Sequence, residues 1–268
     1  MIEIAGVSRS FGDRKVLDDV SFRVKSGRMT GFVGGNGAGK TTTMRIILGV
    51  LSADEGTVSL DGTPVTPADR ARFGYMPEER GLYPKMKVLE QLTLESLSLG
   101  NQQRAQIAAA LVHDPTALVL DEPFSGLDPM AVEVVLGVLR DYAAQGVPVL
   151  FSSHQLDIVE RLCDDVVVIG NGRILAHGSR EALRAEHSGR AFELELTGSA
   201  ADAGWVRDQP GITVTHLDGG FARFDAESDA AARAVLVRAV SADPALTTVR
   251  SFAPVTPSLA QIFKEVVR

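Results

Sequence analysis

The sequence, which is 268 residues long, predicts an α/β domain with a mostly parallel core sheet, followed by a small α+β domain. Three observations support this prediction. Helical patterns alternate with short apolar strands through most of the chain, a glycine-rich loop separates one of these strands from a helix, and the pattern changes near Ser188-Gly189. We therefore expect a first domain over residues 1–187 and a second over residues 188–268.

The first elements are strands, expected over residues 2–7 and 16–24, where apolar side chains alternate onto one face. A third strand, over 29–33, runs directly into the glycine-rich loop. The residues after that loop, 42–51, carry apolar side chains at helical spacing. The segment TVSLDGTPV has Asp61-Gly62 between two extended runs, which predicts a hairpin.

The middle of the chain continues the alternation. A helix is expected over 102–113 and an apolar strand over 117–120. Asp128-Pro129 predicts a helix start, with Asp as the N-cap and Pro at the first helical position, and the helix should end near Gly146. A strand over 147–152 and a helix through Ile158 follow. The segment VVVIGNGRILAH predicts a hairpin that turns on Asn171-Gly172.

The second domain should contain four strands, near residues 192–196, 212–215, 221–224 and 247–252. Helical patterns lie at about 201–207 and 229–240. This order, βαββαβ, predicts a small ferredoxin-like domain, which a final helix over 258–267 would close.

Composition limits the possible partners. The net charge of −7 argues against a surface built mainly for nucleic acid, so we expect no nucleic-acid partner. No apolar run approaches the roughly 20 residues that span a bilayer, and the N-terminus does not look like a secretory signal. We expect a cytoplasmic protein, to which another chain supplies any membrane spans. Cys163 is the only cysteine, so neither an intrachain disulfide nor a cysteine zinc site can form.

The glycine-rich loop carries the strongest chemical signal. Its sequence, GGNGAGKT, fits the phosphate-binding pattern G-x-x-x-x-G-K-[ST] and lies between a strand and a helix. A glycine-rich turn alone could be structural, but Lys40 would neutralise nucleotide phosphates and the Thr41 hydroxyl would hold Mg²⁺. The candidate ATP-binding residues here are Gly34, Gly35, Asn36, Gly37, Ala38, Gly39, Lys40, Thr41 and Thr42.

Two acidic residues follow the apolar strand over 117–120. Asp121 would join the Mg²⁺ shell, and Glu122 is the candidate general base for the attacking water. Acids after a strand are often only a polar strand end, yet these emerge from a fully apolar strand, which favours function. His154 follows another core strand. Taken alone it would be structural, but at a carboxyl end it could reach the γ-phosphate.

These motifs, in this order, resemble those of the ABC ATPases. GGNGAGKTT resembles the family's Walker A loop, LVLDEP its Walker B strand, SGLD (125–128) its D-loop, SSH its switch histidine, and LSLGNQQR a variant of its signature. Phe11 stands where the family stacks an aromatic residue on adenine. The resemblance implies a P-loop core with a parallel sheet and an antiparallel β subdomain.

The resemblance also implies a mechanism in which two copies pair head to tail and bind ATP between them. The second copy would contribute signature and D-loop residues to each ATP, namely Ser98, Gly100, Asn101 and Asp128. Hydrolysis would separate the copies and move a multi-span membrane permease. The protein would then be peripheral on the inner face of the cell membrane.

GYMPEERGLYPKMKV occupies the place of the family's Q-loop, with Glu78 where glutamine is usual. The phrase resembles one bacterial branch of exporter ATPases, some associated with sodium or drug efflux, which also carry an appended C-terminal domain. Glu78 is therefore a candidate both for catalysis and for Mg²⁺.

One departure from the family is large. Between Glu78 and Ser98, with the loss at about 85–97, the chain is too short for the multi-helix subdomain that grips the membrane subunit. A deletion, a segment missing from the sequence as written and a genuinely minimal cassette are three interpretations, of which we favour the first two. If the loss is physical, we expect the protein to bind ATP but to couple hydrolysis poorly to transport.

Three functions therefore compete. The first is the ATPase subunit of an exporter, and the second is a soluble ABC ATPase that acts on the ribosome or on DNA. The third is a nucleotide-binding regulatory module without turnover. The retained motif residues Lys40, Asp121, Glu122 and His154 argue against the third, and the missing helices argue for it.

Overall fold

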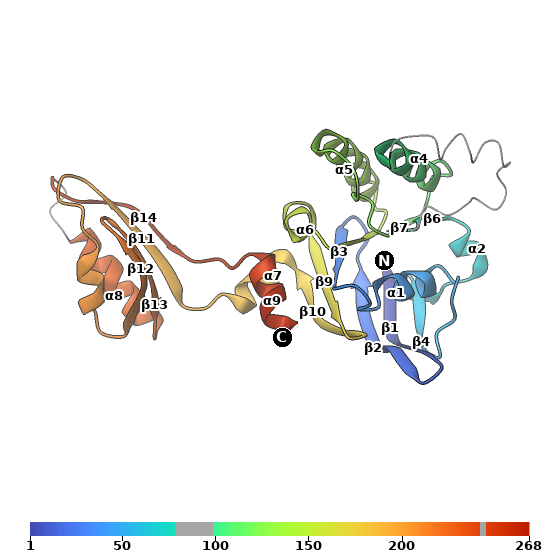
Figure 1. Cartoon of the computed structure of the whole chain (residues 1–268), viewed down its shortest axis with the longest axis horizontal. Coiled ribbons are helices and arrows are strands. Elements are labelled where there is room, and N and C mark those ends of the chain that lie inside the picture. Colours follow the sequence, from blue (N-terminus) through green and yellow to red (C-terminus); the bar gives the residue numbers. More distant parts are fainter. Residues whose placement is uncertain (79–98, 242–244, 268) are drawn as a thin grey trace. The chain divides into compact units, whose positions relative to one another are not determined.

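The computed structural model describes residues 1–78, 99–241 and 245–267, and the chain divides into two compact units. The first unit comprises Met1–Leu183 and Leu259–Arg268, and the second comprises Arg184–Ser258. Figure 1 labels the elements of both. The shortened stretch at about 85–97 lies outside the described residues.

The first unit contains an antiparallel sheet of four strands in the order β2-β1-β4-β5. Their bounds are β1 (Ile2–Phe11), β2 (Arg14–Val24), β4 (Glu55–Leu60) and β5 (Thr63–Pro64). The hairpin at Asp61-Gly62 is confirmed, since Leu60 pairs with Thr63 and both turn residues have positive φ. The β1–β2 hairpin is longer than expected, and it pairs Phe11 with Arg14 at its tip.

The second sheet of this unit has six strands in the order β10-β9-β3-β8-β7-β6. Their bounds are β3 (Met29–Val33), β6 (Phe73–Met76), β7 (Ala117–Leu120), β8 (Val149–Ser153), β9 (Asp165–Gly170) and β10 (Arg173–Ser179). All neighbouring pairs are parallel except β9 with β10. Because parallel strands end at one edge, the segments after β3, β7 and β8 meet there.

Both faces of this sheet are buried, which explains its continuous apolar strands. Along β7, Leu118 and Leu120 belong to one hydrophobic cluster and Val119 belongs to another. The first cluster includes one apolar face of the helix after Asp128, made of Val132, Val135, Leu136 and Leu139. The Asp128 side chain accepts the Ala131 N–H at 2.8 Å, which confirms the predicted N-cap.

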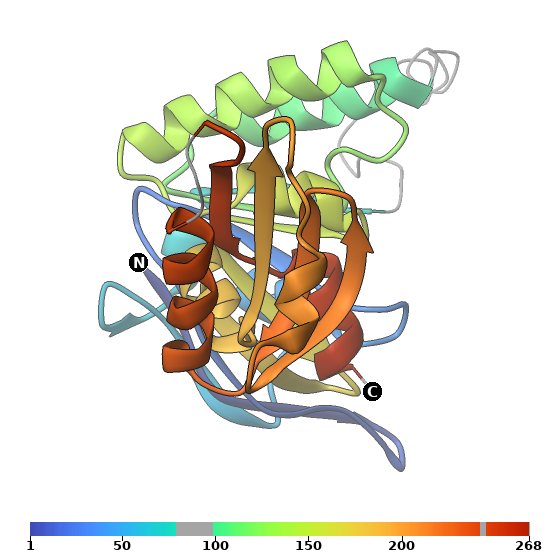
Figure 2. The same ribbon diagram turned by 90° about the vertical axis from the view of Figure 1, so that its left-hand side faces the viewer.

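The helices of the first unit are α1 (Lys40–Ile47), α2 (Pro67–Arg70), α4 (Leu99–Leu111), α5 (Pro129–Ala144), α6 (Leu156–Leu162), α7 (Arg180–His187), which runs into the second unit, and α9 (Leu259–Val266). Helices α4 and α5 lie side by side (Figures 1 and 2). None of the described helices has the length and hydropathy needed to cross a bilayer.

The second unit has its own sheet, in the order β12-β13-β11-β14 with every pair antiparallel. Its elements are β11 (Ala191–Thr197), η1 (Gly204–Asp208), β12 (Ile212–Asp218), β13 (Phe221–Ala226), α8 (Asp229–Val240) and β14 (Thr248–Pro254). This element order agrees with the ferredoxin-like prediction, and α8 covers one face of the sheet (Figure 1).

The helix expected over 201–207 is instead the short 3₁₀ helix η1. Gly204 weakens the helical propensity at the start of η1, and Pro210 disfavours a helical conformation at Gln209. A helix longer than η1 therefore cannot form here. The final helix also differs from expectation. It belongs to the first unit, where Leu259 and Ile262 are buried in the larger cluster, rather than closing the second domain.

Candidate nucleotide site

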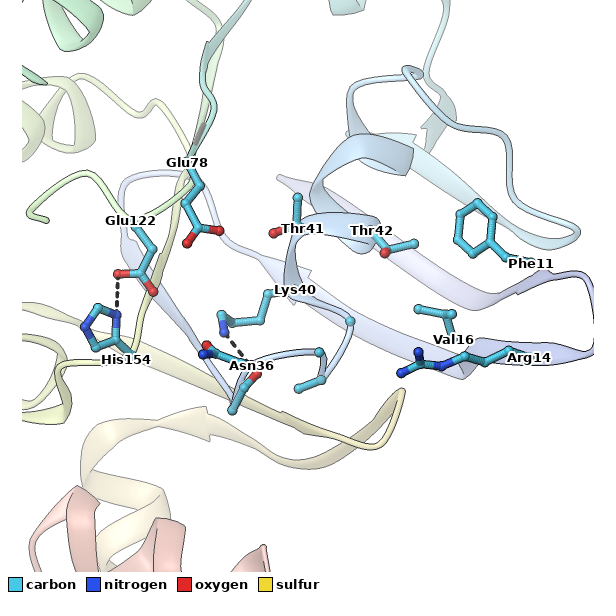
Figure 3. A pocket seen from close by; sticks show the side chains of 14 residues that line it. Phe11, Arg14, Val16, Asn36, Lys40, Thr41, Thr42, Glu78, Glu122 and His154 are labelled. Atoms are coloured by element: carbon cyan, nitrogen blue, oxygen red, sulfur yellow. Dashed lines mark hydrogen bonds and ion pairs between the residues drawn. The ribbon is translucent and has the colours of Figure 1, made fainter. Parts of the chain in front are cut away.

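A pocket of about 750 Å³ opens at the carboxyl edge of the six-stranded sheet (Figure 3). Its lining includes twelve of the residues that the sequence singles out: Phe11, Gly35, Asn36, Gly37, Ala38, Gly39, Lys40, Thr41, Thr42, Glu78, Glu122 and His154. Arg14 and Val16 complete it. Both lie at the start of β2 and belong to no sequence motif, so the sequence does not mark them as pocket residues.

The loop between β3 and α1 curves around the Lys40 ammonium. Lys40 Nζ donates to the carbonyl oxygens of Gly34 at 2.7 Å and Gly35 at 3.2 Å. Gly39, the N-cap of α1, has φ of 111°, and a Cβ there would lie 2.6 Å from Leu17 Cδ2, so only glycine fits. The loop therefore presents a cation and the N-terminus of α1 to the same space, which suits phosphate.

Thr41 and Asp121 come together although 80 residues separate them. The Thr41 hydroxyl donates to Asp121 Oδ2 at 2.8 Å. A hydroxyl and a carboxylate are hard oxygen donors, the type that Mg²⁺ prefers when nucleotide phosphates supply the rest of its shell. The pair fits the predicted Mg²⁺ site, and Glu78 lines the same pocket (Figure 3).

Ser152, at the end of β8, joins the two acidic residues. Its hydroxyl donates to Asp121 Oδ1 at 2.5 Å and accepts the Glu122 N–H at 2.8 Å. Asp121, Glu122 and Ser152 are all buried. Glu122 has φ of 52°, in the left-handed region that non-glycine residues seldom occupy. These contacts therefore fix a strained main chain beside the pocket.

His154 lies across from Glu122, and its Nδ1 is 2.9 Å from Glu122 Oε2. Figure 3 shows both side chains at the pocket end that also holds Lys40 and Glu78. The histidine is more than half exposed, whereas the carboxylate is almost covered. A predicted base and a predicted phosphate sensor thus occupy one wall.

Phe11 lies at the opposite end of the pocket (Figure 3) and is 46% exposed, so an aromatic side chain is accessible there for stacking. The Arg9 guanidinium carbon lies 5.0 Å from the ring centroid. Arg9 Nη1 in turn contacts Asp54 Oδ1 at 2.5 Å, and Asp54 Oδ2 accepts the Ser10 N–H. The Ser10 N–H, together with Arg9, holds the pKa of Asp54 below its ordinary value.

The predicted signature and D-loop residues lie apart from this pocket. Gly100 and Asn101 are in the first turn of α4, and Asp128 caps α5. None of the three lines the pocket within the described chain. Ser98 lies outside the described residues. This separation agrees with residues that would serve an ATP bound to another copy.

Comparison with protein families gives matches along most of the chain. The model for the ABC transporter family matches residues 17–95. A model described as the C-terminal domain of DrrA1-3-like ATP-binding proteins matches residues 178–267. A third, described as an AAA domain, matches residues 85–160. Both parts of the chain therefore have relatives among ATP-binding proteins.

Whole relatives agree with these matches. The ABC transporter ATP-binding protein YhaQ of Bacillus subtilis, itself uncharacterized, is 39% identical over 217 residues, which are 69% of this chain and 73% of YhaQ. A Nod factor export ATP-binding protein I of Paraburkholderia xenovorans is 37% identical over 224 residues, 70% of this chain and 74% of that protein.

The alignment lengths expose a gap. In the YhaQ alignment, 69% of this chain is about 185 residues, so about 32 of the 217 aligned positions have no residue here. The same comparison with the Nod factor protein leaves about 36 of 224 positions without a counterpart. Within the aligned regions, the two relatives therefore contain about 32 and about 36 residues that have no counterpart in this chain.

A solved structure described as the ATP-binding subunit of an ABC transporter superposes with a TM-score of 0.62 at 30% identity, over 69% of this chain and 92% of that one. Sequence and fold thus point to the same family. This chain belongs to the ATP-binding proteins of ABC transporters and contains the ABC ATPase fold.

Proposed function

We propose that this chain binds and hydrolyses ATP as the energy-supplying subunit of a membrane exporter, driven by ATP-dependent pairing of two copies. The observation that carries the proposal is the order of groups along one pocket. The Phe11 ring lies at one end, and Lys40, Glu122 and His154 lie at the other (Figure 3). Thr41 lines the pocket between them and contacts the buried Asp121.

Each group has a role that its position supports. Phe11 stacks on the adenine, and Lys40 with the N–H groups of its loop holds the phosphates. Thr41 and Asp121 hold Mg²⁺, which neutralises phosphate charge when bound. Glu122 accepts the proton of the attacking water, and His154 contacts the γ-phosphate. Glu78 lines the pocket on the same side and supports the water or the metal.

The signature and D-loop residues require a second copy, since Gly100, Asn101 and Asp128 do not line this pocket in the described chain. A two-fold pair in which each copy completes the other's site is the simplest arrangement. The similarity to a Nod factor export ATP-binding protein favours an exporter permease as the membrane partner. The chain would then work at the inner face of the cell membrane, and no nucleic acid is involved.

The shortened stretch bears on coupling. About 32 and 36 aligned positions of two relatives have no counterpart here, a shortfall of the size expected if the helical subdomain is lost where the sequence places the loss, between about 85 and 97. Because that subdomain grips the permease in the family that the sequence resembles, we propose that nucleotide binding survives while coupling to transport is weak. A purified permease of this branch should then stimulate ATP hydrolysis by this chain only slightly.

Glu122→Gln tests the proposal. The amide keeps the shape of the side chain but removes the base, so the variant should bind Mg-ATP, hydrolyse it at least about 100-fold more slowly, and form a dimer on a sizing column only with ATP. Lys40→Ala in the same background should stay monomeric, because the phosphates lose their cation. A Glu122→Gln variant that hydrolyses ATP at the unmodified rate would remove Glu122 from the role of base.

The non-hydrolysing regulatory module is the second candidate, favoured by the internal gap alone. It predicts that Mg-ATP binds the unmodified chain and is recovered intact after prolonged incubation. Time-resolved release of phosphate from ATP distinguishes the two functions directly.

A further inference from the structure

The buried side chain of Gln103 contacts the main chain of Glu122. Gln103 lies in the second turn of α4 and is 3% exposed. Its Nε2 donates to the Glu122 carbonyl oxygen at 3.0 Å. The two residues are 19 positions apart, so the contact is a product of the fold and joins α4 to the segment that follows β7.

The Glu122 main chain needs such support. With φ of 52° it occupies a conformation that is strained for a residue with a side chain. Three hydrogen bonds hold it there: its N–H donates to Ser152 Oγ at 2.8 Å, and its carbonyl accepts from Ser125 N at 3.1 Å as well as from Gln103. Of these, only the Gln103 bond comes from α4.

The direction of the Glu122 carboxylate depends on this conformation. The Cα–Cβ bond points where φ and ψ place it, and Glu122 Oε2 meets His154 Nδ1 at 2.9 Å from that position. A relaxed main chain would turn the carboxylate away from the pocket. A displacement of about 1 Å in a reacting group is enough to cost roughly 100-fold in rate.

The first turns of α4 approach the same segment at two further points. A Cβ on Gly100 would lie 3.6 Å from the Gly126 carbonyl oxygen. An Arg104 guanidinium nitrogen lies 3.6 Å from Asp128 Oδ2, in an exposed ion pair. Gln103 is the buried and directional contact among the three, and so it is the one able to fix geometry.

We infer that Gln103 is a positioning residue for hydrolysis, which holds Glu122 in its left-handed conformation and so aims the carboxylate into the pocket. The inference rests on the proposed role of Glu122 as the base. The Gln103 side chain thereby connects α4, which begins with the signature residues Gly100 and Asn101, to Glu122 in the ATP site of the same chain. The start of α4 and Glu122 would serve different ATP molecules of a pair, so this bond also joins the two sites.

Gln103→Met tests the inference, because methionine keeps the length and much of the volume of glutamine but cannot donate the bond. We expect kcat for ATP to fall between about 10-fold and 100-fold, with KM for ATP and nucleotide affinity unchanged. Gln106→Met is the matched control. Gln106 lies on the same helix and is 4% exposed, and no bond joins it to Glu122 among those found for the described residues.

A double variant separates positioning from general damage to the fold. If Gln103 acts only through the carboxylate, Gln103→Met should not lower the residual rate of a Glu122→Gln protein any further. A purely structural role would lower it again. Equal losses of kcat in the Gln103→Met and Gln106→Met proteins, or a KM that rises with Gln103→Met alone, would overturn the inference.

These outcomes are distinct from a failure of the proposed function. If Glu122→Gln leaves the rate unchanged, the base assignment is wrong and the inference fails with it. If Glu122→Gln abolishes hydrolysis while Gln103→Met turns over normally, the base assignment stands and only the role of Gln103 is lost.

Discussion

Ser152 connects the two acidic residues of the site through a single hydroxyl. It donates to Asp121 Oδ1 and accepts from the Glu122 N–H, and all three residues are buried. Ser152→Ala would leave a buried N–H and a buried carboxylate oxygen each without this partner. We expect the free energy of unfolding of the first unit to fall by about 1–3 kcal/mol, measured by urea unfolding.

The exposed Ser21 provides the comparison for this variant. Its hydroxyl accepts the Gly6 N–H at 2.8 Å at the surface, where water replaces a lost partner. Ser21→Ala should therefore change the stability by no more than about 0.5 kcal/mol. Similar losses of stability for both alanine variants would show that the buried hydrogen bonds of Ser152 stabilise the unit no more than an exposed one does.

Arg9 packs over the Phe11 ring and is held by Asp54, so we expect it to fix the orientation of the ring that would stack on adenine. Arg9→Ala removes a contact of the kind that contributes about 0.5–2 kcal/mol, and we expect the Kd for ATP to rise by about 3-fold to 10-fold. Titration calorimetry on the Glu122→Gln protein measures this without hydrolysis. Arg23→Ala, on the exposed face of β2, should leave the Kd unchanged.

The candidate site could be proposed from the sequence only where its residues are neighbours in one motif. The Lys40 loop and the Asp121–Glu122 pair each lie within one short motif, so their pattern is visible without a fold. Ser152 and Arg9 could not be assigned in this way. Their partners are 31 and 45 residues distant, and only the packing of strands brings them together.

At the scale of elements, pattern and propensity located most helices and strands. The strands Met29–Val33 and Ala117–Leu120 and the helix Asp229–Val240 have the expected bounds. The sequence did not predict strand β6 (Phe73–Met76) or helix α7 (Arg180–His187). Four residues are too few to reveal the alternation of a strand, and α7 is mostly polar, so its sequence lacks an apolar helical pattern. The helix α9 was predicted correctly from its periodicity, but periodicity does not indicate which hydrophobic core a helix packs against.

The destination of α9 gives an element-scale prediction. Ile262 is 1% exposed in the cluster that also holds β7 and α5 residues of the first unit. Ile262→Ala should therefore lower the free energy of unfolding of that unit by about 2–5 kcal/mol and leave the second unit unaffected. Glu265→Ala, on the exposed side of α9, is the control and should have little effect. A loss of stability confined to the second unit would show instead that α9 packs on the second domain, as the sequence predicted.

At the scale of the molecule, the two units have separate hydrophobic cores. The second unit is built around a cluster of its own, in which the Phe224 ring stacks with Phe192 and lies tilted against Phe252. No member of that cluster belongs to the clusters of the first unit among the described residues. Separate cores predict separate cooperative unfolding transitions, whose midpoints respond to different changes.

Nucleotide identifies which transition belongs to which unit. All the residues that line the candidate site belong to the first unit, so Mg-ATP at 100 times its Kd should stabilise that unit alone by about 2.7 kcal/mol. Calorimetry of the Glu122→Gln protein should then show one transition that moves to higher temperature with ATP and one that stays. Phe224→Ala, which opens a cavity at a fully buried position, should lower only the stationary transition. If ATP and Phe224→Ala move the same transition, the two units unfold as one, and the second unit contributes directly to the stability of the nucleotide site.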